Sequence, residues 1–136
     1  MFKKVHVFRI KPGQELLREI GAYCRANNVR SAVIVGLIGS LKWAKINYLL
    51  RLPGQYKSVE YAGPLEIVSG QGSIAMKDGE LVLHIHAQVS NEQGCHGGHL
   101  AEAVVFSTAE VVIAELDFPL KRELDSYTGL NELLPS

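Results

Sequence analysis

The pattern of apolar and polar positions predicts a strand and then a helix at the start of this 136-residue chain. Residues 5–10 alternate, with Val5, Val7 and Arg9 on one face and His6, Phe8 and Ile10 on the other, which is typical of a strand. Pro12-Gly13 ends this segment. From about Gln14 to Asn27, apolar residues recur every three or four positions, which predicts one amphipathic helix. Asn27-Asn28 is expected to end it, because asparagine tolerates the left-handed backbone conformation.

The rest of the chain has the patterns of strands. They cover residues 31–35 (bounded by Gly36 and Gly39), 41–50, 59–68 with an interruption at Gly63-Pro64, 74–76, 81–89, and 100–116 with a break near Ser107-Thr108. Residues 51–58 and the glycine-rich residues 91–98 are expected to be loops, and Asp78-Gly79 indicates a tight hairpin. Many strands and one early helix predict a single α+β domain, residues 1–136, built on a mostly antiparallel sheet.

Four of the five histidines fall between positions 84 and 99. His84 and His86 lie two apart on a predicted strand, so both project from one face about 7 Å apart and can reach one cation. His99 follows the glycine-rich segment, which can fold back to offer a third nitrogen. Three imidazoles with an open fourth position are typical of catalytic zinc sites. His96 and Cys95 are weaker candidate ligands, and ordinary strand or interface positions are the alternative for the histidine pair.

The charges of the chain balance, with 14 Lys plus Arg against 14 Asp plus Glu. This argues against a protein that coats nucleic acid by bulk charge. Residues 1–60 nevertheless carry 11 basic and 3 acidic side chains, a net charge of +8, and the remainder carries 3 and 11, a net charge of −8. A compact fold that interleaves the two halves would pair these charges, whereas a local basic patch would suit nucleic acid or a partner protein.

The chain also lacks the signals of secreted and membrane proteins. Its two cysteines have no CxxC spacing, no signal peptide is evident, and no apolar run approaches the ~18 residues of a membrane span. We therefore expect a cytoplasmic protein without membrane association.

Five motifs occur in order along the chain. They are Gly36-Leu-Ile-Gly-Ser-Leu41, Gly63-Pro-Leu-Glu-Ile67, Lys77-Asp-Gly-Glu80, His84-Ile-His-Ala87 and Gly97-Gly-His-Leu100. Their order and spacing resemble the plants-and-prokaryotes-conserved (PPC) domain. The resemblance covers residues 5 to about 117, and the tail, residues 118–136, is similar to C-terminal extensions of bacterial and archaeal members.

This resemblance implies an antiparallel sheet with a flanking helix, assembled as a homotrimer. It also implies a zinc site at the positions of His84, His86 and His99. The wider superfamily includes acetolactate decarboxylase, whose zinc is held by three histidines in a similar pattern. Residues 100–116 are apolar on both faces, as expected for a strand covered by a helix on one side and by neighbouring subunits on the other.

The chain departs from plant members of the family in two respects. They carry an AT-hook, a basic segment that enters the DNA minor groove, and no such segment occurs here. Pro64 also replaces a basic residue of the plant motif, which argues against plant-type partner docking through this segment.

Glu66 is a candidate catalytic residue beside the histidines. If it shares their face, it could accept a hydrogen bond from an imidazole or act as a general base toward water. The alternative is a solvated strand carboxylate.

Two classes of function remain open at this point. One is a zinc-binding regulatory module that binds DNA or a protein. The other is a zinc-dependent enzyme, lyase-like (as a decarboxylase) or hydrolytic, acting on a small carbonyl or carboxylate substrate, with a small anionic ligand at the metal.

Overall fold

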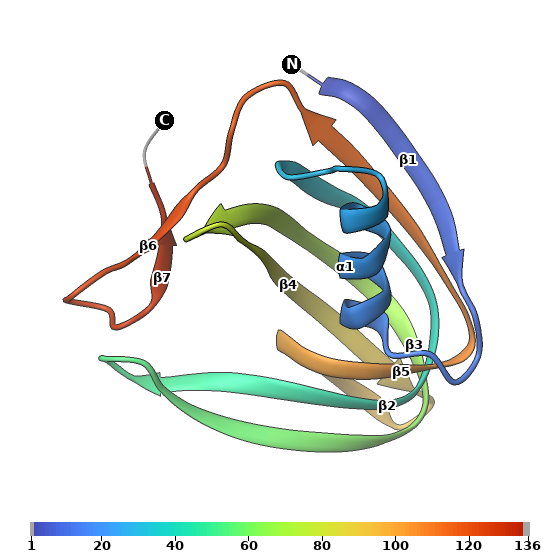
Figure 1. Ribbon diagram of the computed structural model, residues 1–136. Coiled ribbons are helices and arrows are strands. Elements are labelled where there is room, and N and C mark those ends of the chain that lie inside the picture. Colours follow the sequence, from blue (N-terminus) through green and yellow to red (C-terminus); the bar gives the residue numbers. More distant parts are fainter. Residues whose placement is uncertain (1, 135–136) are drawn as a thin grey trace.

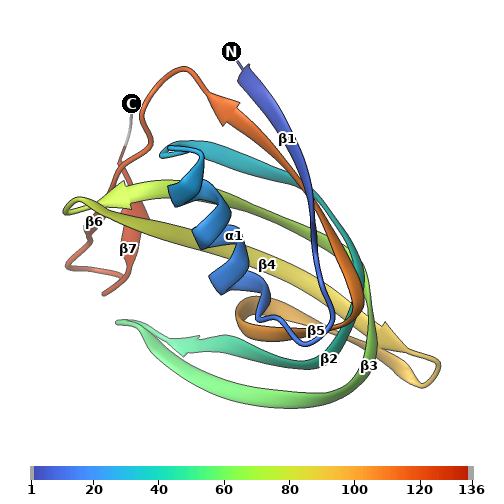
Figure 2. The same ribbon diagram turned by 45° about the vertical axis from the view of Figure 1, so that its right-hand side comes forward.

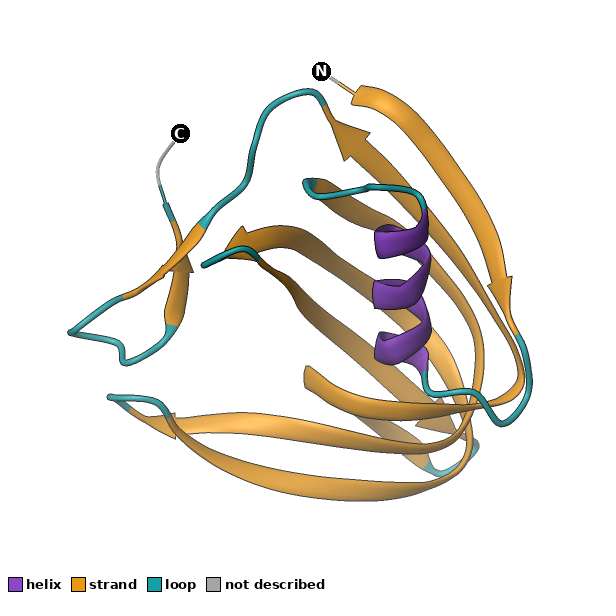
Figure 3. Ribbon diagram, in the orientation of Figure 1, coloured by secondary structure: helices purple, strands orange, loops and turns teal. Residues whose placement is uncertain are grey.

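The computed structural model describes residues 2–134, which form long strands, one helix and a short C-terminal hairpin (Figures 1 and 3). The elements are β1 (Phe2–Ile10), α1 (Leu16–Ala26), β2 (Ala32–Arg51), β3 (Gln55–Lys77), β4 (Glu80–Asn91), β5 (Gly94–Leu116), β6 (Arg122–Leu124) and β7 (Asn131–Leu133). The predicted α+β fold, with a mostly antiparallel sheet and one main helix, is confirmed. That helix is too short and too polar to cross a membrane, and no other helix occurs among the described residues.

The main sheet has the strand order β1-β5-β2-β3-β4, and all of its pairings are antiparallel. The first part of β5 also pairs with the end of β4, from His86 opposite His99 to Asn91 opposite Gly94. Because β5 pairs with strands on both sides of the order, the sheet curls strongly and wraps around α1 (Figures 1 and 2). This additional pairing brings the histidine-rich parts of β4 and β5 together.

Helix α1 begins and ends close to the predicted positions. The Glu15 carboxylate accepts hydrogen bonds from the backbone N–H groups of Leu17 and Arg18, at 3.2 and 2.9 Å, and so caps the helix. At the other end Asn28 has a positive φ of 55°, as expected for an asparagine stop. The apolar face of α1 is fully buried against the concave side of the sheet through Leu16, Ile20 and Cys24.

The strands are longer than predicted, because the glycines and polar residues that suggested breaks lie inside them. β2 continues through Gly36 and Gly39, where register shifts against β5 mark bulges. The predicted break near Ser107-Thr108 is wrong, since β5 runs on without interruption. At Gly39, which has a φ of 150°, an added Cβ would lie only 2.0 Å from the Thr108 carbonyl oxygen. Glycine therefore allows two curved strands to approach each other.

Two predicted loops are also corrected. Residues 51–58 contain only a short turn, because β2 ends at Arg51 and β3 begins at Gln55. Residues 91–98 form the end of the β4–β5 hairpin, and Gly97 and Gly98 are strand residues. A Cβ on Gly98 would lie 2.9 Å from Ile46 Cγ2, so close packing rather than a turn requires this glycine.

Two glycine-containing pairs, Asp78-Gly79 and Gly63-Pro64, differ in their effect on the strands. The Asp78-Gly79 hairpin is confirmed, with φ values of 50° and 80°. Gly63-Pro64 does not interrupt β3.

The C-terminal segment folds back toward the tip of the β2–β3 hairpin. The backbone N–H of Met76 donates to Leu120 O at 3.0 Å, which holds the start of β6 beside the end of β3. Within the segment, the N–H of Leu134 donates to Lys121 O at 3.0 Å and closes the β6–β7 hairpin. The turn between β6 and β7 reaches the β2–β3 hairpin, where Gly54 N–H donates to Thr128 O at 2.8 Å. The tail is thus fixed at two places, the end of β3 and the turn between β2 and β3, and it lines a cavity together with His84 and His86.

Candidate metal centre

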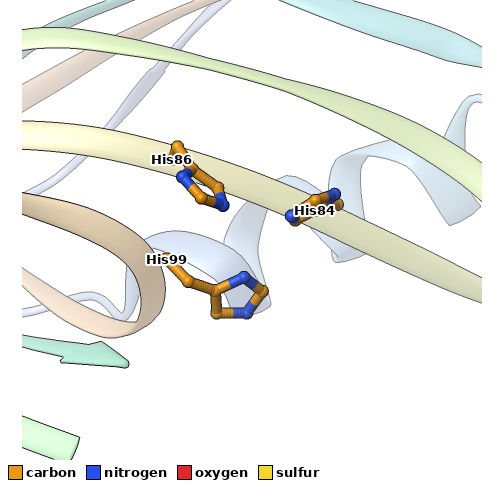
Figure 4. Close-up of side chains that lie close together, drawn as sticks. All are labelled: His84, His86 and His99. Atoms are coloured by element: carbon orange, nitrogen blue, oxygen red, sulfur yellow. The ribbon is translucent and has the colours of Figure 1, made fainter. Parts of the chain in front are cut away.

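Three predicted ligands, His84 and His86 on β4 and His99 on β5, form a cluster (Figure 4). Strand alternation places the first two on one face, while the buried Ile85 and Ala87 point to the other face. The register pairs His86 directly with His99. One nitrogen from each ring lies within 4.8 Å of the others, and the ring centroids are 5.0, 5.1 and 5.5 Å apart.

The surroundings of the cluster favour neutral imidazoles. Burial lowers the pKa of His84 to about 4, with further contributions from the positive Arg122, His99 and His86. Burial and the neighbouring His86 also lower the pKa of His99. A neutral ring has a nitrogen lone pair, which is the form that binds metals.

The donor set fits a zinc ion. Nitrogens that hold one zinc at 2.0–2.1 Å with tetrahedral geometry stand about 3.4 Å apart, which lies inside the 4.8 Å limit of this cluster. Three imidazoles leave the fourth position for another ligand.

The two weaker candidate ligands lie outside the cluster. His96 pairs with the buried Val89, on the opposite face of β5 from His99, and its ring stacks on Tyr61 with centroids 4.1 Å apart. Cys95 is exposed near the end of the β4–β5 hairpin, opposite Ser90.

The structure does not bring Glu66 to the histidines. Glu66 is exposed on β3 and pairs with Ser40 of β2 and Ser90 of β4. Ser90 is four residues beyond His86, which corresponds to about 13 Å along a strand. Glu66 belongs neither to the cluster nor to the adjoining cavity, so its predicted role beside the histidines has no geometric support.

Sequence reasoning missed Arg122, which begins β6 and is only 7% exposed. Its Nη2 lies 3.4 Å from His84 Nδ1 and donates to Ser73 Oγ at 2.9 Å, and its Nη1 donates to Asn131 O at 2.8 Å. Arg122 is one of only three basic residues after position 60. The small number of basic residues in this half of the chain could have drawn attention to Arg122. Nothing in the sequence around Arg122, however, links this residue to the histidines.

The cluster borders a cavity of about 650 Å³. Besides the histidines, its walls include Tyr48 and Tyr56 from the β2–β3 hairpin and Arg122, Leu124 and Leu130 from the C-terminal segment. The volume lies in the range of small-molecule sites, and the walls combine apolar side chains with a few polar groups. The arrangement can therefore expose a bound ion to a small ligand.

Proteins of solved structure resemble the chain over nearly its whole length. A metal-containing protein from Archaeoglobus fulgidus is 30% identical, with a TM-score of 0.90 over 99% of this chain and 96% of that protein. A candidate DNA-binding protein from Ralstonia eutropha JMP134 is 25% identical, with a TM-score of 0.85 over 95% of this chain and 90% of that protein.

Among curated proteins, the bifunctional protein GlmU of Synechococcus sp. (strain JA-3-3Ab) is 33% identical over 133 residues. The match covers 96% of this chain but only 20% of GlmU, so the chain spans about a fifth of the length of this relative. Residues 1–117 match the model of the Plants and Prokaryotes Conserved (PCC) domain, the domain also abbreviated PPC. The chain belongs to this family.

Proposed function

We propose that the protein binds one zinc ion through His84, His86 and His99 and presents it to a small ligand. The observation that carries this proposal is the convergence of three imidazole nitrogens, from two paired strands, beside a cavity. Three imidazole nitrogens are a donor set that zinc commonly binds in proteins. The metal-containing relative from Archaeoglobus fulgidus supports a metal in this fold.

The open fourth position favours ligand binding or catalysis over a purely structural ion. Structural zinc sites are closed by four protein ligands, whereas the cluster contains three, and no fourth His, Cys, Asp or Glu joins it among residues 2–134. The proposed activity is lyase-like, as in a decarboxylase, or hydrolytic, on a small carbonyl or carboxylate substrate. The chemistry that zinc supplies in such sites is polarisation of a carbonyl or activation of water.

The decisive test is metal analysis of untagged protein. We expect about one equivalent of zinc in the wild type and loss of zinc in His84→Ala, while the matched control His96→Ala retains it, because His96 faces away from the cluster. Less than about 0.3 equivalents of any transition metal in the wild type, with no change in His84→Ala, would refute the metal site.

A second candidate function is DNA binding, which the candidate DNA-binding relative from Ralstonia eutropha favours. The zero net charge of the 136 residues argues for weak binding dominated by phosphate contacts. A gel-shift assay with unrelated duplexes is expected to show little binding, and any affinity should fall steeply with salt. Tight, sequence-selective binding to a duplex would make DNA binding the better-supported of the two candidate functions.

We further propose that the chain assembles with copies of itself, as a homotrimer. The face of the sheet turned away from α1 carries an apolar patch, the outer patch, whose members are each more than half exposed: Val5, Val7, Val35, Ile38, Val68 and Phe106. The register places Ile38 next to Val68, because Gly39 pairs with Ile67. Contiguous exposed apolar surface of this kind is typical of subunit interfaces.

Light scattering after gel filtration tests the assembly. We expect a trimer for the wild type and smaller species for Ile38→Glu, while Tyr127→Glu, at an exposed position outside the patch, is the matched control. A monomeric wild type at micromolar concentration would refute self-assembly.

A further inference from the structure

The guanidinium of Arg122 is buried with an incomplete set of partners. Its five N–H donors meet Asn131 O, Ser73 Oγ and His84 Nδ1, whereas Nε has no hydrogen-bond partner. No carboxylate forms a salt bridge with it among the described residues. The Glu132 carboxylate stabilises the charge of Arg122 without forming a salt bridge with it. A buried charge with an incomplete set of acceptors and no contacting counterion is costly, so the site favours an added anion.

Metal binding would remove one of these acceptors. His84 accepts a hydrogen bond from Arg122 only while its Nδ1 carries the lone pair and its proton is on Nε2. Use of Nε2 as a metal ligand moves the proton to Nδ1, and use of Nδ1 consumes the lone pair itself. With either nitrogen as the ligand, Arg122 loses its bond to His84 and faces a second positive charge.

The cavity beside Arg122 indicates what kind of anion fits. Its walls contain one cationic side chain, Arg122, and one carboxylate, Glu132, which already accepts a hydrogen bond from Thr128 Oγ1 at 3.1 Å. Much of the remaining wall is aliphatic, including Leu49, Leu83 and Leu124. These walls suit a single small anionic group on a short apolar chain better than a strongly hydrated dianion.

We propose that Arg122 binds the carboxylate of a small aliphatic carboxylic acid in the metal-loaded protein. The planar guanidinium matches the two oxygens of a carboxylate. Ser73 on β3 and Asn131 on β7 hold it in place, so little side-chain freedom is lost on binding. The inference rests on the proposed zinc site and names its ligand class, with the C-terminal hairpin supplying the residue that selects the ligand.

The test is calorimetric titration of the zinc-loaded full-length protein with isovalerate. We expect isovaleramide, the uncharged isostere, to bind at least about tenfold more weakly, because it lacks the charge that Arg122 recognises. Arg122→Gln should weaken isovalerate binding by about 10- to 100-fold at unchanged zinc content. Lys121→Gln removes the same charge one residue away at an exposed position and should bind isovalerate like the wild type.

Several outcomes would overturn the proposal. They are no measurable isovalerate binding, equal affinity for acid and amide, an Arg122→Gln variant that binds as the wild type does, or tighter binding of inorganic phosphate than of isovalerate. If Arg122→Gln fails to fold by circular dichroism, the acid-against-amide comparison on the wild type decides. Absence of zinc from the loaded wild type would overturn the proposed function and this inference together, whereas zinc-loaded protein that ignores the carboxylate would overturn the inference alone.

Discussion

Two groups of polar side chains that contain histidine, one around the buried His6 and one formed by the partly exposed His84, His86 and His99, differ in how their charges are matched. His6 on β1 is 4% exposed; its Nε2 lies 2.9 Å from Glu115 Oε2, and its Nδ1 lies 3.0 Å from the Tyr23 hydroxyl. Lys3 completes the group with a 3.4 Å contact to the same carboxylate. Each ring nitrogen of His6 has a partner, as in a structural network that joins β1, α1 and β5.

The cluster on β4 and β5 has the opposite character. Three histidines lie together with a buried arginine, and no carboxylate forms a salt bridge within this group among residues 2–134. Burial, followed by the positive Arg122 and the neighbouring histidines, lowers the pKa of His84 to about 4. The converging ring nitrogens of His84, His86 and His99 can therefore bind an ion. Both ring nitrogens of His6, by contrast, already have hydrogen-bond partners within the protein. The difference indicates a candidate binding site on β4 and β5 and a stabilising network around His6.

The largest expected effect that separates the two clusters concerns zinc affinity. We expect His99→Ala to lower zinc affinity by more than about 100-fold, because one of three ligands is lost and second-sphere losses alone reach that range. His6→Ala should leave the affinity unchanged. Competition with a chromogenic chelator measures both, and similar zinc affinities for the two variants would contradict the distinction.

Zinc is next expected to stabilise the fold through the cluster of His84, His86 and His99 only. At a free zinc concentration 1,000 times the Kd, binding contributes about 4 kcal/mol to the free energy of unfolding, which corresponds to a rise in Tm of roughly 10–20 °C for a chain of this size. Scanning calorimetry with zinc and then with EDTA checks this rise. His86→Ala should abolish it, and a persistent rise in that variant would place the ion elsewhere.

The His6 cluster is instead expected to matter for stability without zinc. His6→Ala should lower the free energy of unfolding by about 1–3 kcal/mol, because Glu115 and Tyr23 would be left with unpaired polar groups. Urea denaturation measures the change, with His96→Ala as the control, since its ring is exposed and outside this network. A loss no larger than that of the control would show that the buried network contributes little.

The contrast also explains which parts of the molecule could be predicted. The spacing of His84 and His86 predicts their shared face from strand alternation alone, and the hairpin that returns His99 needs only a short connection. Arg122 could not be placed, because it reaches His84 from 38 positions further along the chain through packing of the tail.

The predicted break in β5 failed for a related reason. Polar residues suggested a loop, but Ser107 and Thr108 form side-chain bonds with neighbouring strands: Ser107 Oγ lies 2.6 Å from Ser40 Oγ, and Arg9 Nε donates to Thr108 Oγ1 at 2.9 Å. Side-chain hydrogen bonds to neighbouring strands cannot be predicted from the local sequence pattern. Local periodicity therefore predicts which face a residue occupies, and tertiary contacts decide where a strand ends.

The smallest expected effect is the pH dependence that Glu115 contributes to stability in the His6 cluster. The hydrogen bond from His6, followed by the contacts of Lys3, holds the pKa of the Glu115 carboxyl below its usual value. Folding therefore favours the carboxylate form, and its stabilising contribution is complete above about pH 4.3, the pKa of glutamate in an unfolded chain. The contribution is lost as the pH falls from there through the lower pKa of the folded state. Glu115→Gln should therefore destabilise the protein at pH 7, and by less at pH 3, in urea titrations. An equal loss at both pH values would mean that the charge of Glu115 does not contribute to the stability of the His6 cluster.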